Sequence, residues 1–227
     1  MERPVVVLEV DVITFAIRDV RLHVLLVKRT EPPFSGAWAL PGARPDPGER
    51  LADAARRALV QRTGLDIVYL EQLYTFDDPA PERPRDPRGP TISVAYFALL
   101  PLTAATDPQA GRGVQHAAWW PADKTPRLAF DHRHILDVAR DRVAAKVDYA
   151  PIAFSVLPDE FTMRELRLVH EALTGRPVMY ENNFWRLMAN RWSLEATGRR
   201  QGSQGRPAAL FRLPKPNEPA ISGEKQP

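Results

Sequence analysis

The segment from residue 31 to residue 65 constrains the fold most, because a stiff loop leads straight into an amphipathic helix. Five prolines and three glycines fall between residues 31 and 49. From Arg50 to Thr63 the apolar residues recur at helical spacing, and Gly64 stands where a left-handed C-terminal cap belongs. The pattern therefore predicts one helix behind a structured loop.

The surrounding sequence predicts a sheet and one further helix. Residues 5–17 and 22–28 are β-branched apolar runs separated by a polar turn, which favours a hairpin. Residues 67–76, 91–100 and 115–120 are also strand-like. A second helix is expected over residues 131–147, where apolar residues again follow the helical period.

The C-terminal third has a different pattern, which predicts a helix-turn-helix. Thr162 and Glu165 have the spacing of a capping box ahead of an apolar stripe that ends before Gly175. A second helix is expected to open at Asn182 or Asn183, both good N-caps. It should carry three side chains inward, namely Phe184, Leu187 and Met188, and two outward, namely Arg186 and Arg191.

A polar, glycine-spaced turn follows over residues 197–206 and lies between two short apolar segments. Such a turn resembles the basic β-hairpin of a winged helix. We therefore expect a first domain over residues 1–150, a winged helix-turn-helix over 151–213 and a disordered tail over 214–227. The connection near residues 148–158 is the expected joint between the two domains.

Composition excludes several kinds of chemistry. The chain has no cysteine, so disulfides, thiolate metal sites and thiol nucleophiles are excluded. The N-terminus has no basic segment leading into an apolar run, and no apolar run is long enough to span a bilayer. We expect a cytoplasmic protein without a membrane partner.

Residues 43–65 resemble the Nudix box, G-x5-E-x7-R-E-U-x-E-E-x-G-U, in which U is apolar. Members of this family hold divalent metal ions on helix carboxylates and hydrolyse nucleoside diphosphates linked to another moiety. In this chain Glu49 and Arg57 are kept, but the three helix carboxylates are replaced by Ala58, Gln61 and Arg62. Because carboxylates at these spacings share one helix face and together bind the hard cation, we expect no metal site and no catalytic residue here.

An arginine in place of a carboxylate can instead contact a phosphate directly. The residues expected to bind such an effector are Trp38, Arg44, Glu49, Arg57, Arg62, Phe76, Arg85 and Arg88. For each a purely structural role stays open. Glu49 and Arg57 could form only a salt bridge, the other arginines could face solvent, and the two aromatic residues could belong to the core.

Positive charge is concentrated late in the chain. Six arginines and a single glutamate fall between residues 186 and 212. A solvated face is the ordinary interpretation of such a run, and DNA phosphate is the alternative partner. The residues expected to contact DNA are Thr162, Arg164, Asn182, Asn183, Arg186, Arg191, Arg199, Arg200 and Arg206.

The order of the two modules resembles the Nudix-related transcriptional regulators of NAD metabolism. The supporting strings include Gly36–Gly42, Leu73–Phe76, Arg85–Gly89, Ser93–Tyr96, Leu128–His132, Leu157–Thr162 and Gly205–Pro207. The resemblance implies an α+β chain, in which a Nudix-like α/β/α sandwich with a mixed sheet precedes a winged helix-turn-helix.

The same resemblance implies a homodimeric repressor of NAD biosynthesis or salvage genes. It would need no cofactor and would respond to ADP-ribose or a related NAD-derived nucleotide, with double-stranded operator DNA as its macromolecular partner. Two other interpretations stay open. One is an active pyrophosphohydrolase of ADP-ribose-type substrates with an accessory domain, and the other is a pseudoenzyme whose C-terminal helices bind protein.

Overall fold

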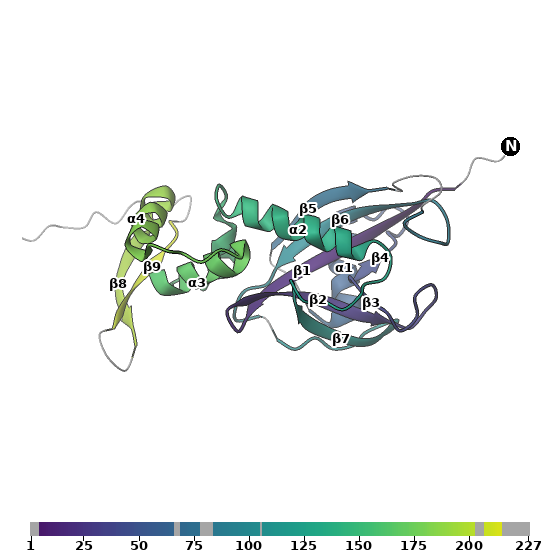
Figure 1. The fold of residues 1–227 in the computed structure, drawn as a ribbon, viewed down its shortest axis with the longest axis horizontal. Coiled ribbons are helices and arrows are strands. Elements are labelled where there is room, and N and C mark those ends of the chain that lie inside the picture. Colours follow the sequence, from purple (N-terminus) through teal and green to yellow (C-terminus); the bar gives the residue numbers. More distant parts are fainter. Residues whose placement is uncertain (1–4, 66–68, 78–83, 105, 203–206, 215–227) are drawn as a thin grey trace, which may run out of the picture.

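The computed structural model describes residues 5–65, 69–77, 84–104, 106–202 and 207–214. Figure 1 shows an elongated molecule with a sheet-based part and a smaller helical part at one end. The elements of the sheet-based part are β1 (Val7–Arg18), β2 (Arg21–Arg29), β3 (Trp38–Ala39), β4 (Gly42–Ala43), α1 (Leu51–Thr63), β5 (Tyr69–Phe76), β6 (Thr91–Leu99), β7 (Val114–Pro121) and α2 (His132–Lys146).

The sheet is mixed and confirms the predicted hairpin. Strands β1 and β2 pair antiparallel on either side of a two-residue turn. Strand β1 also pairs parallel with β6, and the strand order is β3-β2-β1-β6-β5, with β4 on β1 and β7 on β2. The two very short strands β3 and β4 lie in the proline-rich loop, where the sequence predicted no strand.

The two predicted helices cover opposite faces of the sheet, because alternate residues of β1 point to opposite sides. Val10 and Val12 belong to one buried cluster with the alanines and Leu59 of α1. Ile13 and Phe15 belong to the other, with Ile135 and Leu136 of α2. The Nudix-box helix ends at Gly64 with a positive φ of 70°, as expected.

The smaller part has the elements of a winged helix. It comprises α3 (Met163–Thr174), α4 (Glu181–Trp192), β8 (Glu195–Gln201) and β9 (Ala208–Arg212). The predicted capping box is present, since Thr162 caps the backbone N–H of Glu165 and the Glu165 side chain accepts from the N–H of Thr162. Strand β9 also bridges back to Phe161 in front of α3. Within the described residues, no helix has the length and apolarity that crossing a membrane requires.

Two local predictions in this part are wrong. Helix α4 begins one residue before Asn182 and has Tyr180 at its N-cap, so neither asparagine caps it. Leu187 is 51% exposed and does not point inward, whereas Phe184 and Met188 are buried. The apolar spacing alone did not show which side of the helix meets α3.

The connection between the two parts is packed rather than loose. It forms a short 3₁₀ helix, η1 (Pro151–Ser155), whose Ile152 and Ala153 are buried. A single buried cluster runs from Phe15 in the sheet, through this segment, to Met188 in α4. The expected joint is therefore part of a core that both domains share.

Removing a side chain from this shared core should destabilise both parts together. Leu166 of α3 is 1% exposed. We expect Leu166→Ala to lower the free energy of unfolding by about 2–5 kcal/mol, through lost burial and a residual cavity. Urea denaturation followed by circular dichroism measures this, and we expect one cooperative transition.

Leu187→Ala is the matched control, because the same truncation at an exposed site should change stability by no more than about 0.5 kcal/mol. Two separate unfolding transitions in the wild-type chain would contradict the shared core.

Candidate effector and nucleic-acid sites

A cavity of about 340 Å³ lies between β1, the proline-rich loop, the end of α1 and the start of α2. Four guanidinium groups line it, from Arg29, Arg44, Arg62 and Arg88. Acidic side chains lie among them, from Glu9, Asp11 and Glu31. We call this pocket the arginine cavity.

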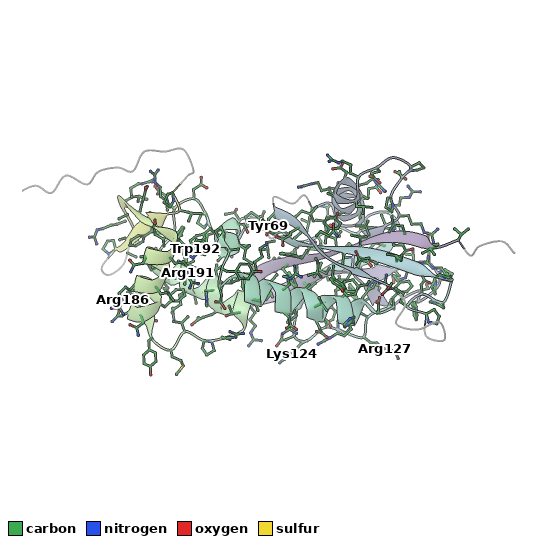
Figure 2. The ribbon with its side chains drawn as sticks, turned by 90° about the horizontal axis from the view of Figure 1, so that it is seen from above. Tyr69, Lys124, Arg127, Arg186, Arg191 and Trp192 are labelled. Carbon is green, nitrogen blue, oxygen red and sulfur yellow. The ribbon has the colours of Figure 1, made fainter. Side chains whose placement is uncertain are left out.

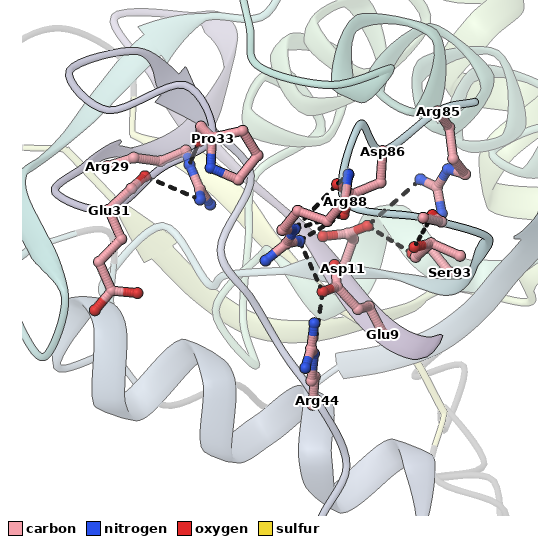
Figure 3. Close-up of polar contacts among 12 residues, drawn as sticks. Glu9, Asp11, Arg29, Glu31, Pro33, Arg44, Arg85, Asp86, Arg88 and Ser93 are labelled. Atoms are coloured by element: carbon pink, nitrogen blue, oxygen red, sulfur yellow. Dashed lines mark hydrogen bonds and ion pairs between the residues drawn. The ribbon is translucent and has the colours of Figure 1, made fainter. Parts of the chain in front are cut away.

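Glu9 holds two of these arginines on one side of the cavity (Figure 3). Its carboxylate accepts from Arg88 at 3.0 Å and from Arg44 at 3.4 Å. Asp86 accepts from Nε of Arg88 and from Nη2, the same nitrogen that donates to Glu9, and the hydrogen bonds with Asp86 raise the pKa of Arg88. Both arginines are therefore pre-positioned while a good part of each side chain stays exposed.

Phe130 forms the aromatic wall of the cavity. The guanidinium carbon of Arg29 lies 4.9 Å from its ring centroid and that of Arg88 lies 5.6 Å away. Phe34 packs edge-on against the same ring at 4.9 Å. Burial lowers the pKa of Arg29, and the nearby positive charge of Arg88 lowers it further. Such crowding of cations favours binding of an anion.

Behind the cavity lies a buried polar layer centred on Asp11. Ser93 donates to its carboxylate at 2.5 Å, Arg85 lies 3.9 Å away, and the His132 ring approaches it at 3.6 Å. A Cβ on Gly42 would fall 2.6 Å from the same carboxylate, so only glycine fits there.

His132 occupies this layer as a neutral ring. Burial lowers its pKa, and its Nδ1 accepts from the backbone N–H of Leu40 at 2.9 Å. The ring proton therefore sits on Nε2, which faces Asp11. The hydrogen bond between Leu40 and His132 ties the loop before α1 to the first turn of α2.

Arg85 contributes to the stability of the fold rather than to the lining of the cavity. It donates to both carboxylate oxygens of Asp131, at 2.7 and 3.0 Å, with only 4% of its side chain exposed. It does not line the arginine cavity.

Glu49 and Arg57 form the bidentate ion pair that was one of their two expected roles. Both contacts are 2.7 Å, and Arg57 also donates to the backbone oxygen of Arg44. Glu49 in turn accepts from the N–H of Asp46. The pair fastens the loop to α1, and neither residue lines the cavity.

The helix positions that carry carboxylates in the Nudix box offer no cation ligand set. Ala58 is fully buried and has no donor atom, and Arg62 brings a positive charge to the cavity. Among the residues that the structure describes, no group of three or more acidic or histidine side chains is arranged to hold a metal ion. The residues present do not fit the divalent cation that the Nudix box implies.

The end of α1 is instead closed by the loop before β7. Backbone N–H groups of Gln109, Gly111 and Arg112 donate to the last free carbonyls of the helix, each at 3.0 Å. Arg62 donates to the backbone oxygen of Arg112 at 2.6 Å. The Arg62 guanidinium is therefore fixed at the cavity wall rather than free in solvent.

The two predicted aromatic residues lie outside the arginine cavity. Trp38 packs edge-on against Trp120 at 5.4 Å. Phe76 lines a neighbouring groove with Tyr74 and His134. Their role in effector binding stays a prediction.

Sequence reasoning missed six polar or aromatic residues of the cavity, namely Glu9, Asp11, Arg29, Glu31, Phe130 and His132. The sequence did contain one signal. Glu9 and Asp11 occupy alternate positions of an otherwise apolar strand, so their side chains must point to the same face of the sheet.

In the winged helix, the predicted arginines are exposed. Arg186 lies at the outer edge of α4 (Figure 2), and Arg199 and Arg200 lie on β8. Arg191 is also exposed, but its guanidinium donates to the backbone oxygen of Asp148. Arg199 pairs with Glu160 at 2.9 Å while 73% of its side chain stays exposed. Arg206 and the tail from residue 215 lie outside the described residues.

The other predicted DNA contacts differ in exposure. Asn182, Asn183 and Arg164 are exposed, whereas Thr162 is 8% exposed and serves as the cap of α3.

Comparisons with known proteins match both parts of the chain to known domain families. Residues 7–138 match the NUDIX domain family and residues 153–213 match the NrtR DNA-binding winged helix domain. The chain is thus a two-domain protein in which a Nudix fold precedes a winged helix. It belongs to the NrtR family within the Nudix proteins.

Two relatives illustrate this membership. The ADPR responsive transcriptional repressor of Acinetobacter baylyi is 32% identical over 92% of this chain and 83% of its own. The NrtR of Shewanella oneidensis, crystallised with a 27mer DNA, has a TM-score of 0.73 at 33% identity, covering 91% of this chain and 93% of its own. Its separate NUDIX domain, crystallised with ADP ribose, has a TM-score of 0.55 at 36% identity, covering 62% and 90%.

A third relative, an ADP-ribose pyrophosphatase of Methanocaldococcus jannaschii, is 34% identical over 50% of this chain and 63% of its own.

The ion pair at Glu49 has a measurable pH signature. Its hydrogen bond with Arg57 lowers the pKa of Glu49 to about 2. The ionised carboxylate therefore stabilises the fold above its ordinary pKa of 4.5, and this contribution is lost as the pH falls toward 2. Carbon-13 NMR titration of the glutamate side chains measures the pKa directly.

We expect Arg57→Gln to return this pKa toward its ordinary value and Arg50→Gln, which removes only a neighbouring charge, to leave it low. A Glu49 pKa near 4.5 in the wild-type protein would contradict the ion pair.

Proposed function

We propose that this chain is a DNA-binding transcriptional repressor whose Nudix domain binds ADP-ribose, or a related nucleotide diphosphate, without hydrolysing it. One observation carries the proposal. The face that holds carboxylates in the Nudix box here contributes Arg62 to a cavity lined by three other arginines. A phosphate ligand that a metal ion would otherwise bridge can meet guanidinium groups directly.

The chemistry of the cavity suits a nucleoside diphosphate sugar. Planar guanidinium groups form bidentate hydrogen bonds with phosphate oxygens. Arg44 and Arg88 are held by Glu9 with much of their side chains exposed, so they would bind a diphosphate with little loss of side-chain freedom. Phe130 offers a ring face for a base or an apolar edge of a ribose.

Hydrolysis would need a group to activate water beside the diphosphate. Ala58 and Gln61 have no negative charge with which to bind a hard cation, and the positive charge of Arg62 would repel such a cation. The Glu49 carboxylate is already engaged by Arg57. We therefore propose that the cavity binds the nucleotide intact, unlike a pyrophosphohydrolase.

The winged helix supplies the DNA contact in this proposal. Arg186, Arg191, Arg199 and Arg200 are exposed on α4 and on the hairpin that follows it. Phosphate contacts from such arginines position a recognition helix in the major groove. We propose a homodimer on a two-fold operator, since one winged helix contacts too few base pairs for operator specificity. The family resemblance points to NAD biosynthesis or salvage genes as its targets.

Helix α2 would link the two sites. It starts beside the cavity, where Phe130 is part of the wall and Asp131 and His132 form the first turn. At its other end, Arg191 of α4 donates to the backbone oxygen of Asp148. Because Ile152 and Ala153 of the linker are buried in the shared core, we propose that a shift of α2 moves the winged helix directly, rather than through a loose joint.

Fluorescence anisotropy tests the proposal, with duplexes enriched by the wild-type chain from a random library. We expect DNA binding that weakens with salt, by a log-log slope of about −0.9 for each phosphate neutralised. ADP-ribose should shift the DNA Kd by a factor of about 5–150, the usual range of allosteric coupling. Chromatography after incubation with magnesium should recover ADP-ribose unchanged.

Each alternative makes a different prediction. Release of AMP from ADP-ribose would support the pyrophosphohydrolase. An absence of enriched duplexes, even at low salt, would support a protein-binding module and contradict the repressor.

A further inference from the structure

The exposed face of α4 contains one apolar residue among polar ones. Asn183, Arg186 and Asn190 recur three to four residues apart and so lie on one side of the helix. Together with Leu187 and Arg191 they line a shallow surface groove. We call Asn183, Arg186, Leu187 and Asn190 the α4 stripe.

Leu187 has no packing role that explains its position. Phe184 and Met188, on the other side of the helix, are 7% and 4% exposed and join the shared core. Leu187 keeps 51% of its surface exposed in the middle of the stripe. A single exposed leucine is ordinary on a protein surface, so exposure alone identifies no partner.

Charge identifies the partner class. The stripe contains Arg186 and no acidic residue, and Arg191 lines the same groove. Two further exposed arginines, Arg199 and Arg200, lie on β8 of the same winged helix. A polyanion fits this surface better than another protein does. Duplex DNA is also the only common polyanion that presents methyl groups at regular positions in a groove wide enough for a helix.

We infer that Leu187 is a specificity-determining residue that packs against the C5-methyl group of a thymine in the major groove. This inference rests on the proposed DNA-binding function and deepens it. The neighbouring side chains have the complementary chemistry, since asparagine pairs with adenine and arginine with guanine in the same groove. Asn183 accepts a hydrogen bond from Arg186 at 3.3 Å, which orients that guanidinium along the stripe.

Replacing thymine with deoxyuridine isolates the contact, because the two bases differ only by the methyl group. Each thymine of an enriched duplex is replaced in turn, and the Kd is measured by anisotropy. Burial of one methyl group is worth about 0.8 kcal/mol, or about a fourfold change in Kd. We expect one thymine position in each half-site to show this loss with the wild-type chain.

Replacing the sensitive thymine with deoxyuridine should raise the Kd of the Leu187→Ala variant less than about twofold, because the variant no longer reaches the methyl group. Leu187→Gln provides a second variant with the same expected result. Met179→Ala is the matched control. Met179 lies just before α4 and outside the stripe, and its apolar side chain is 78% exposed. This control should keep the full deoxyuridine loss.

Equal deoxyuridine losses in the wild-type chain and both Leu187 variants would overturn the inference while leaving DNA binding intact. The inference would also be overturned if no thymine were sensitive to the replacement, or if sedimentation showed that Leu187→Ala changes the oligomeric state. Failure to enrich any duplex would instead overturn the proposed function itself.

Discussion

The ion pair between the buried Arg85 and the partly exposed Asp131 is the contact on which the rest of the architecture depends. With 4% of its side chain exposed, the Arg85 guanidinium needs a carboxylate partner, because an unpaired charge at such a site is strongly destabilising. Asp131 immediately precedes α2, and Asp11, 3.9 Å from the same guanidinium, lies on the central strand. The start of α2 is therefore fixed against the sheet at the point where the arginine cavity opens.

This arrangement places the arginine cavity and the winged helix at the two ends of one helix. Phe130 and His132, at the first turn, line the cavity, and the buried cluster beyond the last turn includes residues of α3 and α4. In the proposed coupling, a tilt of α2 is the movement that would reach both the cavity and the winged helix. At the three carboxylate positions of the Nudix box this chain has Ala58, Gln61 and Arg62, and in the proposed function Arg62 contacts phosphate where the Nudix box would bind a cation.

Local sequence patterns predicted most elements, because periodicity and capping are properties of neighbouring residues. The hairpin of β1 and β2, the helix ending at Gly64 and the capping box of Thr162 are examples. The cavity was only partly predictable, since its contacts join residues far apart in the chain, such as Glu9 with Arg88 and Glu9 with Arg44. Leu187 was assigned to the wrong face for the same reason, because tertiary packing decides which side of a helix is buried.

The central claim is that nucleotide binding and DNA binding are coupled within one packed body. Its most direct test is the affinity for ADP-ribose, measured by isothermal titration calorimetry with the free protein and with protein saturated by an enriched duplex. Because coupling between two sites is reciprocal, the duplex should change the Kd for ADP-ribose by the same factor by which ADP-ribose changes the Kd for the duplex. An ADP-ribose Kd that is identical with and without DNA would contradict the account.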